Sequence, residues 1–393
     1  MSTHPGPLAG TVVIDLTRAL AGPHAGMMMA DLGARVIKVE SPGTGDETRI
    51  WGPPFVKDQT GADVATYFLS CNRNKESIAL DLKSEEGKEV LTELVKRADV
   101  LMENFRPGVL DRLGFPTDHL LELNPGLVVL AISGFGHDGP EGGRPGYDQI
   151  AQGEAGLMSM TGSGPDDPQR VGVPIGDLLS GMYGAYGVLA ALLERERTGK
   201  GQVVRTSLLA SFVGVHAFQG TRWTVAKEIP RAQGNHHPSI CPYGLFTCAD
   251  GAVQIACGNE SLWQKLCTEF GIDPATEGMA TNSERVANRP AVIELLERTF
   301  ADIPGEEVLR RVGAAGVPSG RVRDLQEVYE WDQTLSQGLL IDVEHPTLGG
   351  IQLPGPPLRF FTGDGTEVTK KDHASPPLLD EHGESLREWI RSD

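Results

Sequence analysis

The chain has 393 residues, of which 39% are hydrophobic and 22% charged, and its formal net charge at pH 7 is −18. This length and composition are typical of a globular protein whose core is large enough for two or three domains. The acidic balance argues against nucleic acid as a partner, because that binding needs a basic surface. A small phosphate-bearing ligand remains compatible with it, since a few local cations can hold one.

The sequence also lacks features that would set a compartment or a cofactor. Residues 1–5 show no signal-peptide pattern and no apolar run has the length of a membrane span, so we expect a cytoplasmic protein without membrane contact. Five cysteines, an odd number without CxxC spacing, favour buried thiols in a reducing compartment over disulfides or zinc. His236 and His237 are adjacent and therefore point to opposite sides of an extended segment, so we expect no metal site.

Predicted strands and helices alternate over the first third of the chain. Apolar periodicity predicts strands at 11–16, 36–40, 77–82, 100–102 and 127–132, and helices at 27–32 and 85–97. This alternation predicts an α/β fold with a doubly wound parallel sheet. Because such sheets bind ligands at the carboxyl ends of their strands, the loops that follow strands are the first candidates for a site.

The rest of the chain centres on the stretch 171–184 and the helix that follows it. An apolar run ends in Gly176-Asp177, a helix of small residues continues to Arg195, and Gly199 closes it. Asp177 is therefore predicted at the N-cap, where the helix dipole and free N–H groups favour an ionised carboxylate. Such a carboxylate beside a glycine is either a candidate nucleophile or an ordinary cap.

Two polar loops carry the residue types that bind a phosphate and a base. The loop 103–112 offers an amide, an aromatic ring and two guanidinium groups, and the loop 71–77 is polar and cationic. Arginine and lysine can bind phosphates, and phenylalanine can stack on adenine. Either loop can equally be an ordinary solvated surface loop.

A dinucleotide-binding dehydrogenase is the weaker alternative. Glu40 ends the second strand, where such enzymes have the acid that binds ribose, but no glycine fingerprint lies between the first strand and helix. The GxGxxG match at 134–139 leads into Pro140 instead of a helix and is predicted to be a loop. A serine hydrolase is also disfavoured, since no GxSxG motif occurs.

The pattern changes after a predicted strand at 203–205 and a predicted helix at 208–223. Strands at 243–248 and 253–257 predict an antiparallel hairpin, and helices are expected at 261–270, 290–300 and 306–312. A smaller α+β domain is therefore expected from about 230 to 330. An amphipathic helix at 380–390 ends the chain.

Together these features resemble the class III CoA-transferases, the formyl-CoA transferase or CaiB/BaiF-like family, which also contains the α-methylacyl-CoA racemases. The resemblance covers essentially the whole chain and rests on the segments 15–23, 32–40, 103–108, 176–177 and 197–202. Within the family, the segments 46–55, 70–75 and 234–238 are most similar to transferases that move CoA between succinyl-CoA and dicarboxylic acids such as glutarate.

The resemblance implies an activity and an assembly. An enzyme of this family moves CoA from an acyl-CoA, here succinyl-CoA, to a carboxylic acid, here a dicarboxylic acid, with CoA esters as substrates and no tightly bound cofactor. Asp177 would attack the thioester, form a mixed anhydride and then an aspartyl-CoA thioester. The family forms interlocked homodimers. The resemblance also implies a large CoA-binding domain of residues 1–225 completed by 335–393. The small domain would be residues 226–334, and the last helix would pack on the N-terminal sheet.

The resemblance also assigns residues to the two substrates. CoA would be held by Asn104, Phe105, Arg112, Leu80, Ala19, Lys83 and Arg144. The acyl group would meet Arg18, Arg49, Trp51, Arg73, Tyr147 and Asp148. Ser41-Pro42 stands where the family often has a basic residue, which leaves one CoA contact unassigned.

Two alternatives on the same scaffold stay open. Racemases exchange a proton between a histidine and an aspartate, but the matching position here is Tyr147, whose reference pKa of about 10 suits that exchange poorly near pH 7. A non-catalytic CoA-binding protein would need the loop 104–112 but not Asp177. The transferase is therefore the preferred interpretation.

Overall fold

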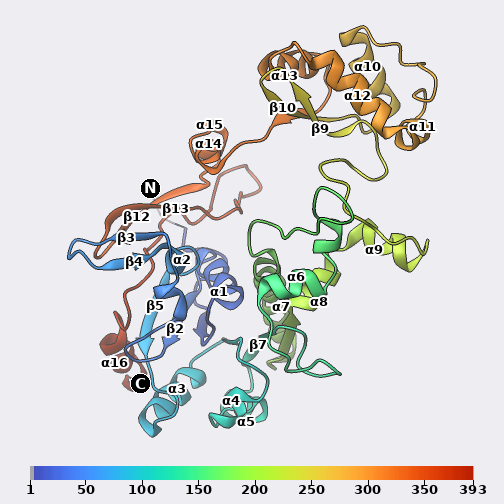
Figure 1. Ribbon diagram of the computed structural model, residues 1–393. Coiled ribbons are helices and arrows are strands. Elements are labelled where there is room, and N and C mark those ends of the chain that lie inside the picture. The colour runs from blue at the N-terminus through green and yellow to red at the C-terminus, as the bar shows by residue number, and fades with distance from the viewer. Residues whose placement is uncertain (1–3, 393) are drawn as a thin grey trace. The chain divides into compact units, whose positions relative to one another are not determined.

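The structure is a computed structural model that describes residues 4–392. The chain forms two compact units (Figure 1): the first contains residues up to 157, 171–225 and from 332 onward, and the second contains 158–170 and 226–331. Residues 158–170, which the sequence analysis placed in the large domain, thus belong to the second unit. They are bound there by backbone hydrogen bonds from Ala232 to Ser159 and from Gly234 to Gly162.

A six-stranded sheet forms the centre of the first unit. Its order is β5-β2-β1-β6-β7-β8, and every neighbouring pair is parallel. The chain winds from β1 toward one edge and then from β6 toward the other, so β1 and β6 meet at the switch point where such sheets bind ligands. The predicted parallel α/β fold is confirmed. The strands are β1 (Val12–Asp15), β2 (Arg35–Glu40), β5 (Lys75–Ala79), β6 (Val100–Glu103), β7 (Val128–Ser133) and β8 (Val203–Ser207).

Helices cover both faces of this sheet because its strands are apolar on both sides. On one face α1 (Ala21–Asp31) and α7 (Ile175–Thr198) bury a shared apolar cluster with the strands. On the other face lie α3 (Glu85–Lys96), α5 (Thr117–Leu123) and α16 (Gly383–Arg391). Helix α16 packs on β5 and α3, and Asp380 just before it accepts the Ala79 N–H at 2.7 Å.

Helix α7 differs from the prediction at its start and matches it at its end. It begins at Ile175 after Pro174 and has no side-chain cap, so Asp177 lies within its first turn and the predicted N-cap position is wrong. The Gly176 N–H in the first turn instead donates a hydrogen bond to the side chain of Asp148, which lies outside this helix. The end is as predicted, since Gly199 adopts the left-handed conformation with a φ of 69°.

Within residues 4–392, α7 is also the one helix that is long and apolar enough to cross a membrane by length and composition. No apolar run of that length was expected from the sequence, and this helix is the exception. Its small residues instead let it pack closely on α1. A Cβ atom on Gly181 would lie 2.6 Å from the carbonyl oxygen of Ala21.

Shorter elements complete the first unit. The predicted helix at 208–223 is two helices, because the chain turns at Val215 and His216 and Ala217 takes a positive φ. The others form a hairpin, a second small sheet and single turns. These elements are η1 (Glu47–Ile50), β3 (Phe55–Lys57), β4 (Asp63–Ala65), α2 (Thr66–Leu69), α4 (Val109–Arg112), α6 (Asp148–Glu154), α8 (Leu208–Gly214), α9 (Ala217–Thr224), α15 (Asp332–Ser336), β12 (Leu340–His345) and β13 (Gly349–Pro354).

The second unit has its own core around a three-stranded antiparallel sheet. The predicted hairpin is confirmed, and Phe246, Trp263 and Phe300 are buried among its apolar residues. All five cysteines are free and buried, as predicted. The elements are η2 (Met158–Met160), β9 (Tyr243–Cys248), β10 (Gly251–Ala256), α10 (Glu260–Phe270), α11 (Asn282–Ala287), α12 (Arg289–Phe300), α13 (Gly305–Ala314), β11 (Ser319–Arg321) and α14 (Leu325–Tyr329).

The close contact between α1 and α7 gives a stability test. Gly181→Ala should destabilise the fold by about 1–3 kcal/mol, because the added methyl group meets backbone that cannot move aside. Urea unfolding measures the loss. Gly313→Ala on α13 is the matched control: nothing lies within 4 Å of its added Cβ, so it should leave stability unchanged or raise it by up to about 1 kcal/mol. Equal stability of Gly181→Ala and wild type would contradict the packing described.

Candidate functional site

The loop that follows β1 is held in place by the residue that follows β6. The Asn104 side chain accepts the backbone N–H of Arg18 at 2.9 Å and donates to its carbonyl at 2.7 Å. Both strands end at the switch point of the sheet, which is why residues 86 positions apart meet there. Asn104 therefore fixes the backbone of the β1–α1 loop.

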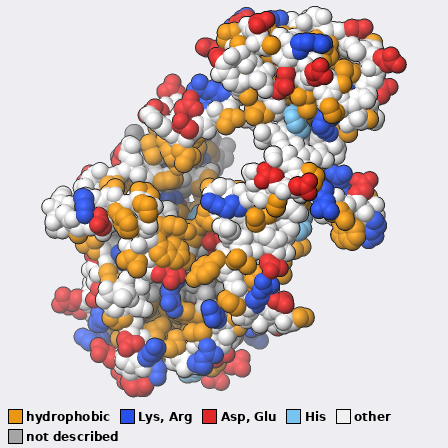
Figure 2. Space-filling model, viewed as in Figure 1, with side chains coloured by type: hydrophobic (Ala, Val, Ile, Leu, Met, Phe, Trp, Pro, Cys, Tyr) orange, Lys and Arg blue, Asp and Glu red, His pale blue; other side chains and the backbone are white. Residues whose placement is uncertain are grey.

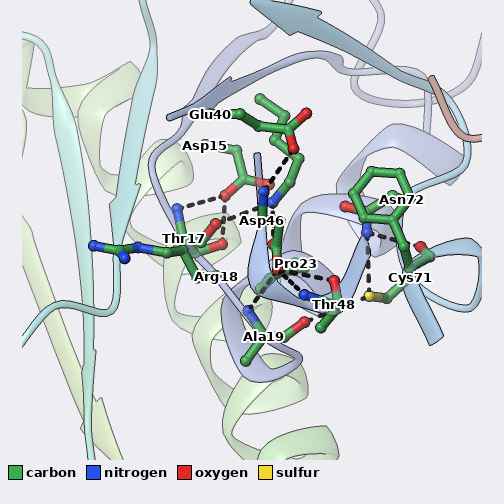
Figure 3. Close-up of polar contacts among 12 residues, drawn as sticks. Asp15, Thr17, Arg18, Ala19, Pro23, Glu40, Asp46, Thr48, Cys71 and Asn72 are labelled. Atoms are coloured by element: carbon green, nitrogen blue, oxygen red, sulfur yellow. Dashed lines mark hydrogen bonds and ion pairs between the residues drawn. The ribbon is translucent and has the colours of Figure 1, made fainter. Parts of the chain in front are cut away.

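Buried ion pairs lie close to this loop, and Figure 3 labels their carboxylates, Asp15 and Asp46. The Lys38 Nζ atom lies 2.8 Å from Asp46 and donates to the Thr17 carbonyl at 3.0 Å, while Lys75 pairs with Asp15 at 3.0 Å. Burial disfavours the charge on Lys38, but the surrounding carboxylates outweigh it and raise its pKa. The ammonium group therefore stays charged under the loop.

The same network holds an unusual backbone conformation at Ala19. Its φ is 63°, in the left-handed region that costs a non-glycine residue roughly 1–2 kcal/mol. The Ala19 N–H donates to Asp46 at 3.3 Å. The Arg18 side chain next to it extends away from the ion pairs (Figure 3) and is exposed, with its guanidinium 5.0 Å from the centre of the Phe105 ring.

A cavity of about 290 Å³ lies at this edge of the sheet. It brings together four of the residues predicted to contact substrates: Arg18, Leu80, Lys83 and Phe105. Ala19, Arg112 and Arg144 do not line it. Arg144 pairs with Glu141 and Glu154, and the Arg112 guanidinium lies 3.2 Å from where a Cβ atom on Gly108 would be.

Two of the predicted substrate arginines are engaged inside the fold. Arg49 binds both oxygens of Glu40 at 2.7 and 2.8 Å, and its guanidinium lies 3.7 Å from the centre of the Phe68 ring. Arg73 is buried and binds Asp31 through two nitrogens. Both arginines are therefore paired with a carboxylate of the fold itself. Glu40 at the end of β2 accepts these hydrogen bonds from Arg49, so it has a role within the fold and not as a ribose ligand.

Asp177 is half-buried in the first turn of α7. Burial disfavours its charge, the nearby Asp148 carboxylate disfavours it further, and together they raise the pKa of Asp177 to about 7. This differs from the prediction of a carboxylate kept ionised by the helix start, because desolvation and a like charge outweigh the helix dipole. Near neutral pH, Asp177 is therefore about half ionised.

Asp148 and Gln152 on α6 connect to the segment before Asp177. Asp148 Oδ1 accepts the Gly176 N–H at 2.7 Å, and Gln152 Nε2 donates to Asp148 Oδ2 at 2.7 Å. The predicted neighbour Tyr147 is 67% exposed. Sequence reasoning missed Gln152, although its spacing of four residues from Asp148 on a helix is a usable signal.

An aromatic pair includes Tyr67, on whose hydroxyl the charge of Asp177 acts. The rings of Trp51 and Tyr67 meet edge to face with centres 5.2 Å apart. Burial, followed by the Asp177 charge, raises the pKa of Tyr67 to about 12, so its hydroxyl stays protonated at neutral pH. Trp51 was predicted for the acyl site. Tyr67 was missed, because only the fold brings α2 close to α7.

The whole chain is similar to proteins of one known family. The model of CoA-transferase family III matches residues 8–383. A succinyl-CoA:glutarate CoA-transferase of Mus musculus is 37% identical over 390 residues, covering 98% of this chain and 87% of its own. An acetyl-CoA:oxalate CoA-transferase of Acetobacter aceti is 39% identical over 385 residues, covering 97% and 95%. The crystal structure of a CAIB/BAIF family protein from Brucella suis has a TM-score of 0.86 at 40% identity, covering 98% of this chain and 99% of that one.

The raised pKa of Asp177 predicts a pH-dependent effect on stability. The pKa of Asp177 is about 7 in the folded protein against an ordinary value of 3.8. The folded protein therefore loses stability as the pH rises from 4 to 7, and the full loss is present above pH 7. Asp177→Asn should therefore have a higher melting temperature than wild type at pH 8, and the gap should narrow as the pH falls from 7 toward 4. Calorimetry across that range measures it. The exposed Glu196 on the same helix is the control, since Glu196→Gln should show no such narrowing.

Proposed function

This chain belongs to CoA-transferase family III, and from that premise we propose that it moves CoA from succinyl-CoA to a dicarboxylic acid, with Asp177 as the nucleophile. The observation that carries the proposal is the placement of Asp177, a poorly solvated carboxylate at the start of a core helix with a pKa of about 7. A carboxylate without a full hydration shell and without a cationic partner is a stronger nucleophile than a solvated one.

The chemistry proceeds by two exchanges at each substrate. A carboxylate oxygen of Asp177 bonds to the thioester carbonyl, and the C–S bond breaks to give an aspartyl-succinyl anhydride and CoA thiolate. The thiolate attacks the aspartyl carbonyl, which releases succinate and leaves an aspartyl-CoA thioester. The acceptor carboxylate then reverses both steps. The positive end of α7 stabilises the negative charge that develops on the attacked carbonyl oxygens.

CoA would occupy the cavity beside the β1–α1 loop. Leu80 and Phe105 supply its apolar surface, and Lys83 and Arg18 are cations on its lining. Asn104 would act by holding the loop. Ala19 and Arg112 stay in the proposal as neighbours of this cavity, whereas Arg144 is already paired with two glutamates.

Arg18 is the residue we assign to the second carboxylate of the acyl group. Its guanidinium is exposed, and it forms no ion pair with any residue from 4 to 392. Its backbone is fixed by Asn104, so the cation projects from a rigid base. The names of the two relatives fit this assignment, since glutarate and oxalate are both dicarboxylic acids. Trp51 and Tyr67 would cover the acyl chain on the other side.

We also propose an interlocked homodimer in the cytoplasm. Apolar side chains gather on the surface of the first unit (Figure 2). Exposed residues of α7 include Met182, Tyr186 and Leu193, which a second copy of the chain would cover. Five unpaired thiols support a reducing compartment.

CoA exchange by the purified protein tests the function. With succinyl-CoA as donor and glutarate, oxalate and acetate as acceptors, new CoA esters should form, and Asp177→Ala should lower the rate at least about 10³-fold because no other residue replaces the nucleophile. Binding of CoA without exchange would identify a non-catalytic binding protein. Deuterium entering the α-carbon from heavy water, without exchange, would identify a racemase.

Arg18→Gln tests the assignment of the second carboxylate. The KM for glutarate should rise roughly tenfold or more, since an exposed charge-assisted contact is lost, while the KM for the monocarboxylate butyrate stays unchanged. Steady-state kinetics with both acceptors at saturating succinyl-CoA measure the difference. An equal effect on both acceptors, with a raised KM for the donor, would instead place Arg18 in the CoA site.

A further inference from the structure

We infer that Asp148 and Gln152 are a positioning pair that presents Asp177 to the acyl group, by fixing the start of α7 and by placing a second carboxylate beside the nucleophile. This inference rests on the proposed function, because it gives Asp177 the role of nucleophile. It goes beyond that function by naming what sets the position and the reactivity of Asp177.

The first part of the inference is a clamp made of three hydrogen bonds. Gln152 Oε1 accepts the Val171 N–H at 2.8 Å, Asp148 Oδ1 accepts the Gly176 N–H at 2.7 Å, and Gln152 Nε2 joins the two side chains at 2.7 Å. Both side chains are buried on one face of α6. They thus tie both ends of the segment 171–176, which leads directly to Asp177, to the same helix.

The clamp leaves little freedom at the residue before the nucleophile. A Cβ atom on Gly176 would lie 2.5 Å from the Phe212 ring and 3.0 Å from Asp148 Oδ1. Glycine is therefore required there for the backbone to reach the Asp148 carboxylate. Phe212 on α8 is itself fully buried, so its ring has little room to move aside.

The second part of the inference is electrostatic. Among the described residues, Asp148 on α6 acts on the charge of Asp177, and the charge of Asp177 acts in turn on the protonated Tyr67 on α2. His24 on α1 lies near Gly181, one turn further along α7. Burial, followed by Arg73 and Lys75, lowers the pKa of His24 to about 4, so it is neutral near pH 7. Helix α8, Leu208–Gly214, contributes no charged residue. Asp148 is thus the charge that acts most directly on Asp177.

This like charge favours the acylated enzyme over the free enzyme. When Asp177 bonds to the donor carbonyl, its negative charge leaves with the CoA thiolate, and the repulsion from Asp148 ends. The aspartyl-CoA thioester is also neutral at Asp177. Asp148 therefore raises the free energy of the ionised nucleophile relative to both covalent intermediates and speeds their formation.

A double substitution separates the charge from the hydrogen bonds. In D148N/Q152E the new amide oxygen accepts the Gly176 N–H, the new amide nitrogen donates to the new carboxylate, and that carboxylate accepts the Val171 N–H. The clamp stays complete while the charge moves one helical turn away. The acid limb of kcat/KM against pH should shift down by about one pH unit, and kcat at pH 8 should fall roughly tenfold.

Two further variants complete the kinetic test. Gln152→Met breaks the hydrogen bonds of Gln152 to Val171 and to Asp148 and keeps the Asp148 charge, so kcat should fall while the acid limb stays in place. Glu154→Gln removes a charge from the same helix at an exposed position paired with Arg144. This variant should change neither kcat nor the position of the acid limb. A wild-type kcat in Gln152→Met would overturn the clamp, and an unmoved limb in the double variant would overturn the electrostatic role.

A direct titration keeps this test apart from the proposed function. In protein labelled with ¹³C-aspartate, the resonance lost in Asp177→Asn reports the titration of Asp177 whether or not CoA is transferred. Its midpoint should fall in D148N/Q152E and stay unchanged in Glu154→Gln. An unchanged midpoint would overturn the inference, whereas a shifted midpoint in a protein without exchange would overturn only the proposed function.

Discussion

The first unit depends on two buried lysines whose ammonium groups lie close to the carboxyl end of β1. Lys75 and Lys38, from β5 and β2, neutralise Asp15 and Asp46, and Lys38 also binds the Thr17 carbonyl of the β1–α1 loop. Burying these charges is costly unless each is paired and hydrogen-bonded, and here each is. The network therefore specifies one loop conformation, including the left-handed Ala19, and with it one wall of the candidate CoA cavity.

Two carboxylates of the same unit show how surroundings separate structural from reactive groups. Burial alone would raise the pKa of Asp15, but Lys75 and Lys38 lower it below its ordinary value. Asp177 is also desolvated, yet its charged neighbour is another carboxylate, so its pKa rises to about 7. The same side chain is a fixed anion in one place and, in the proposed mechanism, the nucleophile in the other.

Local sequence signals predicted the fold better than the site. Apolar periodicity located the parallel strands and the hairpin of β9 and β10, and the glycine expected just past a helix located the end of α7 at Gly199, because these signals depend on neighbouring residues. The start of α7 was misplaced by three residues, since the N-cap is Pro174 and the Gly176 N–H is bound by Asp148, 28 positions away. Gln152 and Tyr67 were missed for a related reason: their roles arise from contacts that form only when α6, α2 and α7 are packed together.

The basic residues illustrate why residue type alone does not identify an anion site. A chain with a net charge of −18 can still bind a polyanion if unpaired cations lie within about 8 Å of it, the distance over which salt screens charge. The family resemblance assigned Arg49 and Arg73 to the substrate, but they form ion pairs with Glu40 and Asp31. Arg18 and Lys83 form no ion pair within residues 4–392 and line one cavity. Pairing inside the fold, which the sequence does not display, therefore decides which cations remain for the substrate.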